Sequence, residues 1–156
     1  MITLLAIAHK KQRNAPMNLL PYAEVSLAQG VEGDIFGKPG KRQVTLLSQQ
    51  QWQQACAQLQ TELPWASRRA NLLLDGLEFA PELVGKYLKI GEHLVLELTG
   101  ETDPCGKMER AHPGLEAALM PAWRGGCTAK VINPGKIRPQ DPVQILDSWP
   151  NRNLDL

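Results

Sequence analysis

Short apolar segments separated by turn residues dominate this chain. The first, residues 2–8, predicts a buried strand, and the alternation of Leu94, Leu96 and Leu98 predicts another strand with three leucines on one face. Further strand-like runs lie at 23–27, 42–47, 71–74, 87–90, 127–132 and 143–146. Roughly seven or eight short strands predict a mainly β domain, and closure into a barrel would remove exposed strand edges.

One segment has the periodicity of a helix. Ser48 and Gln51 have the spacing of a capping box, in which the hydroxyl accepts from the backbone at Gln51 and the Gln51 amide reaches back. Apolar residues then recur on one helix face: Trp52, Ala55, Cys56 and Leu59. We expect Pro64 to end this helix and Cys56 to be a small core residue. Pro113 predicts a second short helix, so two or three peripheral helices accompany the strands.

The composition is typical of one folded domain. The 156 residues are 43% hydrophobic and 21% charged, which predicts a single domain over residues 1–147 and a C-terminal tail over residues 148–156. The formal net charge is +1 and no long basic run occurs, so neither nucleic acid nor a membrane is expected as a partner. Residues 2–8 lack the pattern of a signal peptide, and three cysteines without a CxxC pair indicate a reducing compartment. We therefore expect a cytoplasmic protein.

Cys105 has the sequence context of a reactive cysteine. It lies in an irregular stretch between Pro104 and Gly106, which leaves the sulfur approachable, and Lys107 and Arg110 are close in sequence. Nearby cations favour the thiolate, the form that ligates soft metals or attacks sulfur. Cys127, at the start of a predicted strand, is expected in the core. A zinc site formed by Cys105, Cys127 and His112 is a weaker alternative without paired CxxC spacing.

Two groups of basic residues could hold an anionic small molecule or simply be solvated. They are Lys38, Lys41 and Arg42, and Arg68 and Arg69.

Several short stretches, in order and over nearly the whole chain, resemble the small bacterial proteins of the MOSC family, named for the C-terminal domain of molybdenum-cofactor sulfurases. They include Gly30–Asp34, Arg42–Leu47, Arg69–Leu72, Thr102–Met108, Pro113–Leu115, Arg124–Gly126, Gly135–Ile137 and Asp141–Val143. The resemblance implies a β-barrel of the pyruvate-kinase-barrel-like type. It also implies a functional cysteine in the Pro-Cys motif, which is Cys105 here.

In this family the matching cysteine ligates molybdenum or is proposed to carry sulfur, so the resemblance implies the molybdenum cofactor (molybdopterin) as ligand. Its phosphate needs fixed cationic donors, for which Arg69, Lys107 and Arg124 are candidates. Asn71 could hydrogen-bond the pterin or hold a loop. Asp34 could orient a ligand or cap backbone amides, with the structural role favoured. The family also carries an association with pyridoxal phosphate binding, and the molybdenum cofactor is expected to be lost on purification.

The resemblance is compatible with two activities. One is that of a molybdenum-dependent oxidoreductase, such as a reductase of N-hydroxylated small molecules, and the other is that of a sulfur transferase. A reductase would need an electron-transfer partner, because three cysteines are too few to hold a cysteine-ligated iron–sulfur cluster and no GxGxxG motif occurs. A sulfur transferase would need a cysteine desulfurase. Two positions depart from the family pattern: Ile35–Gly37 replaces a basic or histidine-containing stretch, and Ala70 replaces an acidic residue. Both remove polar groups, which motivates the alternative of a non-catalytic binding barrel.

Overall fold

A closed barrel of seven strands forms the centre of the molecule. The computed structural model describes residues 1–149, and its main sheet has the order β11-β7-β8-β9-β5-β6-β1-β2, with β1 also paired to β11. The strands of this sheet are β1 (Ile2–His9), β2 (Asn18–Leu20), β5 (Val44–Ser48), β6 (Leu72–Asp75), β7 (Tyr87–Ile90), β8 (Leu94–Glu101), β9 (Cys127–Asn133) and β11 (Pro142–Leu146). The predicted mainly β barrel is therefore confirmed.

The eight-residue strand β1 closes the barrel because its two halves have different partners. Its beginning pairs with β11 through Ile2 and Val143, whereas its end pairs with β2 through Ile7 and Leu20. β6 lies along its other edge, where Ile7 is opposite Leu72. Most strand pairs are antiparallel, but β5 and β6 are parallel. The segment that connects them contains α1, because a parallel pair requires a crossover connection.

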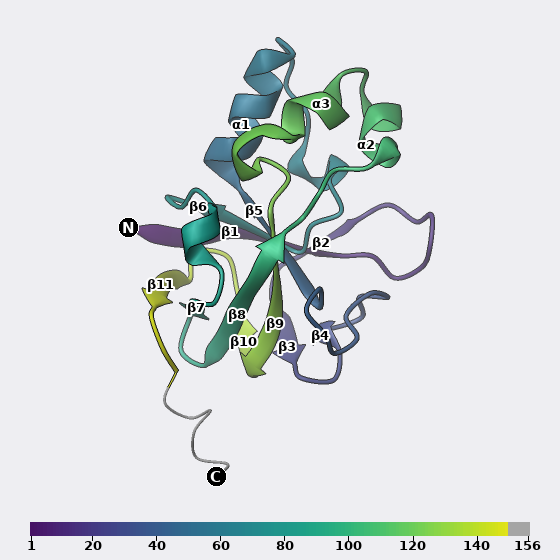
Figure 1. Ribbon diagram of the computed structural model, residues 1–156. Helices are drawn as coiled ribbons and strands as arrows, with labels where there is room; N and C mark the ends of the chain where they lie inside the picture. The colour runs from purple at the N-terminus through teal and green to yellow at the C-terminus, as the bar shows by residue number, and fades with distance from the viewer. Residues whose placement is uncertain (150–156) are drawn as a thin grey trace.

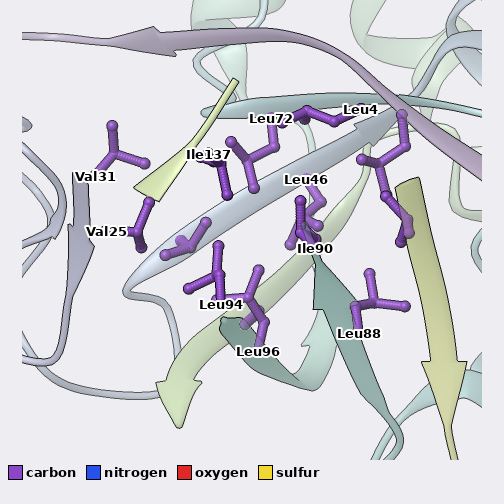
Figure 2. Close-up of a cluster of buried hydrophobic side chains, with 14 of the residues drawn as sticks. Leu4, Val25, Val31, Leu46, Leu72, Leu88, Ile90, Leu94, Leu96 and Ile137 are labelled. Carbon is purple, nitrogen blue, oxygen red and sulfur yellow. The ribbon is translucent and has the colours of Figure 1, made fainter. Parts of the chain in front are cut away.

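A second, smaller sheet covers part of the barrel. It has the order β10-β3-β4, with β3 (Ala23–Ser26), β4 (Gly30–Val31) and β10 (Gly135–Ile137). Figure 2 shows side chains of both sheets in one cluster, with Val25 and Ile137 of the small sheet near Leu46 and Leu96 of the barrel. Leu46, Leu96 and Ile137 are at most 1% exposed, so this cluster is the main core.

Three helices gather at one side of the barrel (Figure 1). They are α1 (Gln49–Gln58), α2 (Gly106–Ala111) and α3 (Leu115–Leu119); single turns of 3-10 helix lie at Trp65–Ser67, Pro81–Leu83 and Pro121–Trp123. Trp52, Ala55 and Cys56 of α1 form a second apolar cluster with Leu115 and Met108 of the other two helices. No helix within residues 1–149 has the length and apolar character required to cross a membrane.

The capping box predicted at Ser48 is half right. The Ser48 hydroxyl accepts from the Gln51 backbone N–H at 3.2 Å, as expected. The Gln51 amide does not reach back; its Nε2 donates to the carbonyls of Phe79 and Ala122, and its Oε1 accepts from the Phe79 N–H. The helix also ends at Gln58, six residues before the expected stop at Pro64. Strands β2, β4 and β10 were not predicted, because two or three residues are too few to show an apolar alternation. Helix α2 was not predicted either, because it begins directly after Cys105 in a stretch that the sequence indicates to be irregular.

Candidate functional site

Cys105 lies where strand β8 gives way to helix α2. Its side chain is exposed, and its backbone carbonyl accepts from the Met108 N–H at 2.9 Å, which starts the helix. The sulfur takes no part in capping this helix. Met108 anchors α2 in the apolar cluster with α1 and α3. The fold therefore holds the backbone of Cys105 while leaving its sulfur accessible.

Segments remote in sequence meet beside Cys105 because of strand register. The end of β1 is paired with the beginning of β6, and the end of β8 with the beginning of β9. Leu46 of β5 lies between the two pairs, opposite both Leu72 and Cys127. The residues after β1 and β8 and those before β6 and β9 consequently share one end of the barrel.

A cavity of about 360 Å³ opens at this end, and Cys105 is part of its wall. The wall comes from the β1–β2 loop, from residues 66–69, from residues 102–108 and from Arg42. Across the described part of the chain, the charged side chains of this wall are Lys10, Arg42, Arg68, Arg69 and Lys107, against the carboxylate of Asp103. The cavity is therefore strongly cationic, whereas the whole chain is nearly neutral.

Arg68 clamps the loop that carries Cys105. Its side chain is 5% exposed; Nε donates to the Gly125 carbonyl at 3.0 Å, and Nη2 donates to the carbonyls of Thr102 and Asp103, both at 3.3 Å. Burial lowers the pKa of this guanidinium, and the nearby Cys105 and Asp103 oppose that shift. Within residues 1–149 no carboxylate forms an ion pair with it. Arg68 is thus a buried cation held by carbonyl oxygens at the wall of the cavity.

Gly125 allows the same loop to pack closely on the beginning of β9. A Cβ at this position would lie 2.5 Å from the Thr102 carbonyl oxygen and 3.3 Å from Cδ of Pro104. The Thr102 N–H also donates to the Gly126 carbonyl at 3.0 Å. The absence of a side chain at residue 125 therefore decides how closely the Cys105 loop approaches the barrel.

Arg69 stacks on Phe36, one of the residues that depart from the family pattern. The guanidinium carbon is 4.4 Å from the ring centroid, a distance at which a cation is attracted to the ring face. Burial lowers the pKa of Arg69, and the negative charge of Asp34 opposes that shift. Phe36 thus stands where the family pattern has a polar stretch, but its ring orients the Arg69 guanidinium at the cavity wall.

Comparisons with known proteins agree with this architecture. The family model of the MOSC domain matches residues 28–144. The chain belongs to the MOSC domain family. Among solved structures, YuaD from Bacillus subtilis has a TM-score of 0.74 at 15% identity, covering 96% of this chain and 98% of its own.

Two YiiM structures are also similar to the MOSC barrel described here. That from Geobacillus stearothermophilus has a TM-score of 0.76 at 15% identity, with 94% of this chain and 75% of the other covered. That from Escherichia coli has a TM-score of 0.67 at 15% identity, with 94% and 71% covered. At this identity the likeness concerns the fold. No curated protein sequence matches the chain.

The MOSC barrel brings only some of the predicted site residues to the cavity. Arg69 and Lys107 line it together with Cys105, and Asp34 lies next to it. The Asp34 carboxylate accepts from the Lys10 N–H at 2.9 Å, which is the backbone-capping role favoured from sequence.

Asn71 and Arg124 are placed elsewhere. Asn71 is 2% exposed; its Oδ1 accepts from the backbone N–H and hydroxyl of Thr45, and its Nδ2 donates to the Ala8 carbonyl. Arg124 donates from Nη1 to Gln58 and to the Ala118 carbonyl, on the side of α1 and α3. Neither residue lines the cavity. Both side chains hold segments of the barrel and helices together.

The sequence did not indicate Lys10 as a site residue, and it indicated Arg42 and Arg68 only as members of two basic groups. All three line the cavity. The pairs Arg68-Arg69 and Lys41-Arg42 were visible signals, but nothing in the sequence connected them to Cys105, because that depends on strand register.

The three residues of the zinc alternative are not brought together. Cys127 is 1% exposed in the main core, whereas Cys105 is exposed beside the cavity. Within residues 1–149 no group of three or more His, Cys, Asp or Glu side chains is arranged to hold a metal ion.

Burial of Cys127 should make the protein less stable in alkali. Burial raises the pKa of this thiol to about 12, whereas a free cysteine titrates near about 8.5. The buried neutral thiol of Cys127 contributes fully to the folding stability below about pH 8.5. This contribution is lost as the pH rises toward about 12, because the thiol ionises more readily in the unfolded chain than in the folded one. We expect a loss of roughly 2–3 kcal/mol at about pH 10.5.

Urea unfolding of the wild type and Cys127→Ala at about pH 8 and about pH 10.5 would measure this loss. The wild type should lose more stability than the variant between the two pH values. An equal loss in both proteins would contradict the prediction.

Proposed function

We propose that this protein binds the molybdenum cofactor in the cationic cavity, with Cys105 as a sulfur ligand of the metal. The observation that carries the proposal is an exposed cysteine in the wall of a cavity with five basic side chains and one carboxylate, in a member of the MOSC family. No other described cysteine is accessible, since Cys56 and Cys127 are buried.

The residues present fit such a ligand in size and chemistry. A volume of about 360 Å³ is within the range of about 300–1,000 Å³ that is usual for small-molecule sites. A cysteine thiolate can ligate a transition metal, and guanidinium groups bind phosphate by paired hydrogen bonds. When bound, the cofactor would supply a redox-active metal centre.

The roles of the protein side chains follow from their positions. Cys105 would hold the metal through its sulfur, while Arg69 and Lys107, at the wall of the same cavity, would bind the phosphate. Arg68 would keep the Cys105 loop in place through the carbonyls of Thr102 and Asp103. The stacking of Arg69 on Phe36 would keep its guanidinium oriented before the ligand arrives, which lowers the entropic cost of binding.

The test is the molybdenum content of the protein from a host that makes the cofactor. Rapid anaerobic purification is preferred because the cofactor is expected to dissociate during isolation. We expect about one molybdenum per chain in the wild type and less than about one tenth of this in Cys105→Ser, because the substitution removes the thiolate ligand. Cys56→Ala, which removes a buried thiol in α1, should keep its molybdenum. Equal contents in the wild type and Cys105→Ser, including none in both, would contradict the proposal.

A persulfide on Cys105 is the second candidate function, favoured by the same accessible sulfur. It predicts that incubation with a cysteine desulfurase and cysteine adds one sulfur atom to Cys105, measured by mass spectrometry of the intact protein. The molybdenum proposal predicts an unmodified thiol in this experiment. Reduction of N-hydroxylated substrates by the molybdenum-bound form, and transfer of sulfur from the persulfide form to an acceptor, remain predictions of the family resemblance.

A further inference from the structure

A second, smaller cavity adjoins the one beside Cys105. Its volume is about 120 Å³, and its wall consists of Lys10, Arg13, Asn14, Phe36 and Lys107. Lys10 and Lys107 also line the larger cavity, so the two cavities are neighbours that share these two side chains. Most of the new wall comes from the loop between β1 and β2, drawn in purple in Figure 1.

Like charges are held close together at the junction of the two cavities. Burial lowers the pKa of Lys10, and the positive charges of Lys107 and Arg69 lower it further. Asp34 opposes this effect, and its carboxylate bonds to the Lys10 backbone. One carboxylate therefore faces a group of cations that repel one another. A negatively charged ligand at the junction would relieve this repulsion.

Phe36 provides the surface that holds these cations in position. Its ring is approached by Arg69 at 4.4 Å and by Arg13 at 6.0 Å. Arg13 comes from the β1–β2 loop and lines the smaller cavity, whereas Arg69 lines the larger one. One half-buried aromatic residue thus places a guanidinium at the wall of each cavity.

The size of the smaller cavity limits what it can hold. About 120 Å³ is well below the range of about 300–1,000 Å³ for sites that enclose a whole drug-sized ligand. It has room for a single compact group. Three basic side chains and the Asn14 amide suit an oxyanion such as a phosphate, which accepts several hydrogen bonds at once.

We propose that the two cavities form one extended site for a ligand that carries a diphosphate, with one phosphate near Lys10 and Lys107 and the other in the smaller cavity with Arg13. This inference deepens the proposed function, because the diphosphate would belong to the ligand bound beside Cys105. A diphosphate would occupy both cavities, whereas a single phosphate would occupy only one of them. The ligand class is therefore a pyrophosphate ester, such as a nucleotide-extended form of a cofactor.

Calorimetry with inorganic pyrophosphate and inorganic phosphate tests the inference on the full-length chain without metal. At low ionic strength we expect pyrophosphate to bind at least about tenfold more tightly than phosphate. Arg13→Gln should reduce this ratio to about threefold or less, because it removes a cation of the smaller cavity alone. Lys38→Gln makes the same charge change at an exposed residue outside both cavities and should leave the ratio unchanged.

The outcomes separate this inference from the molybdenum proposal. Cys105→Ser should retain the preference for pyrophosphate, since the sulfur is not part of the smaller cavity. Equal binding of the two anions, or an equal effect of Arg13→Gln and Lys38→Gln, would overturn the inference. Either result would leave the molybdenum content of the wild type and of Cys105→Ser to decide the proposed function.

Discussion

Gly125→Ala is expected to lower the free energy of unfolding by about 3 kcal/mol and to displace the loop that carries Cys105. The new Cβ would lie 2.5 Å from the Thr102 carbonyl oxygen, a backbone atom that cannot move without its neighbours. The displacement would also strain the contact with Pro104, the residue before the cysteine. Urea unfolding measures the stability, and the rate of alkylation of Cys105 at constant pH measures the change in its surroundings.

Gly106→Ala is the matched control for this substitution. Gly106 follows Cys105 directly, but a Cβ there meets no other atom within 4 Å. It opens helix α2, where alanine is more favourable than glycine. We expect unchanged or slightly increased stability in Gly106→Ala. Comparable losses in the two variants would show that the close approach at Gly125 does not hold the loop.

Arg68→Gln is expected to cost about 3 kcal/mol, although the neighbouring Arg69→Gln should cost less than about 1 kcal/mol. Arg68 satisfies the carbonyls of Gly125, Thr102 and Asp103, and a glutamine cannot donate to all three in the same geometry. An unsatisfied buried carbonyl costs about 1–3 kcal/mol, and water entering from the cavity would recover part of the sum. Arg69 is half-buried and contacts the ring of Phe36.

Urea unfolding and amide hydrogen exchange would measure the two effects. The Thr102 N–H, bonded to the Gly126 carbonyl at 3.0 Å, should exchange faster in Arg68→Gln than in Arg69→Gln. Equal stability losses, or unchanged exchange at Thr102, would contradict the role of Arg68 as a clamp. If Arg69 contacts the ligand directly, Arg69→Gln should weaken ligand binding more than Arg68→Gln does, although Arg68→Gln has the larger effect on stability.

The two arginines illustrate which part of the site could be predicted from the sequence. The family resemblance selected Arg69 and Cys105, and both are in the cavity wall. The sequence shows Arg68 only as part of a basic pair, because its burial and its three carbonyl partners depend on where the loops after β8 and before β9 lie. Asn71 and Arg124 were selected in the same way as Arg69, yet their side chains bond to Thr45 and Gln58, away from the cavity.

The domain boundaries remain predictions. The MOSC match spans residues 28–144, inside the expected domain of residues 1–147. The expected tail, residues 148–156, lies mostly outside the described residues, which end at 149.

The sequence alone determined the seven strands of the barrel, the N-cap of α1 at Ser48 and the position of Cys105 outside the strands, because apolar alternation, capping residues and Pro-Gly turn signals act over a few neighbouring residues. Only the tertiary structure decided that Lys10, Arg42 and Arg68 lie in the same cavity wall as this cysteine. Their meeting depends on the register between strands and on the closure of β1 against β11, which join residues up to 141 positions apart. Local propensities contain no information on such pairings, so the electrostatic character of the site emerges only when the barrel closes.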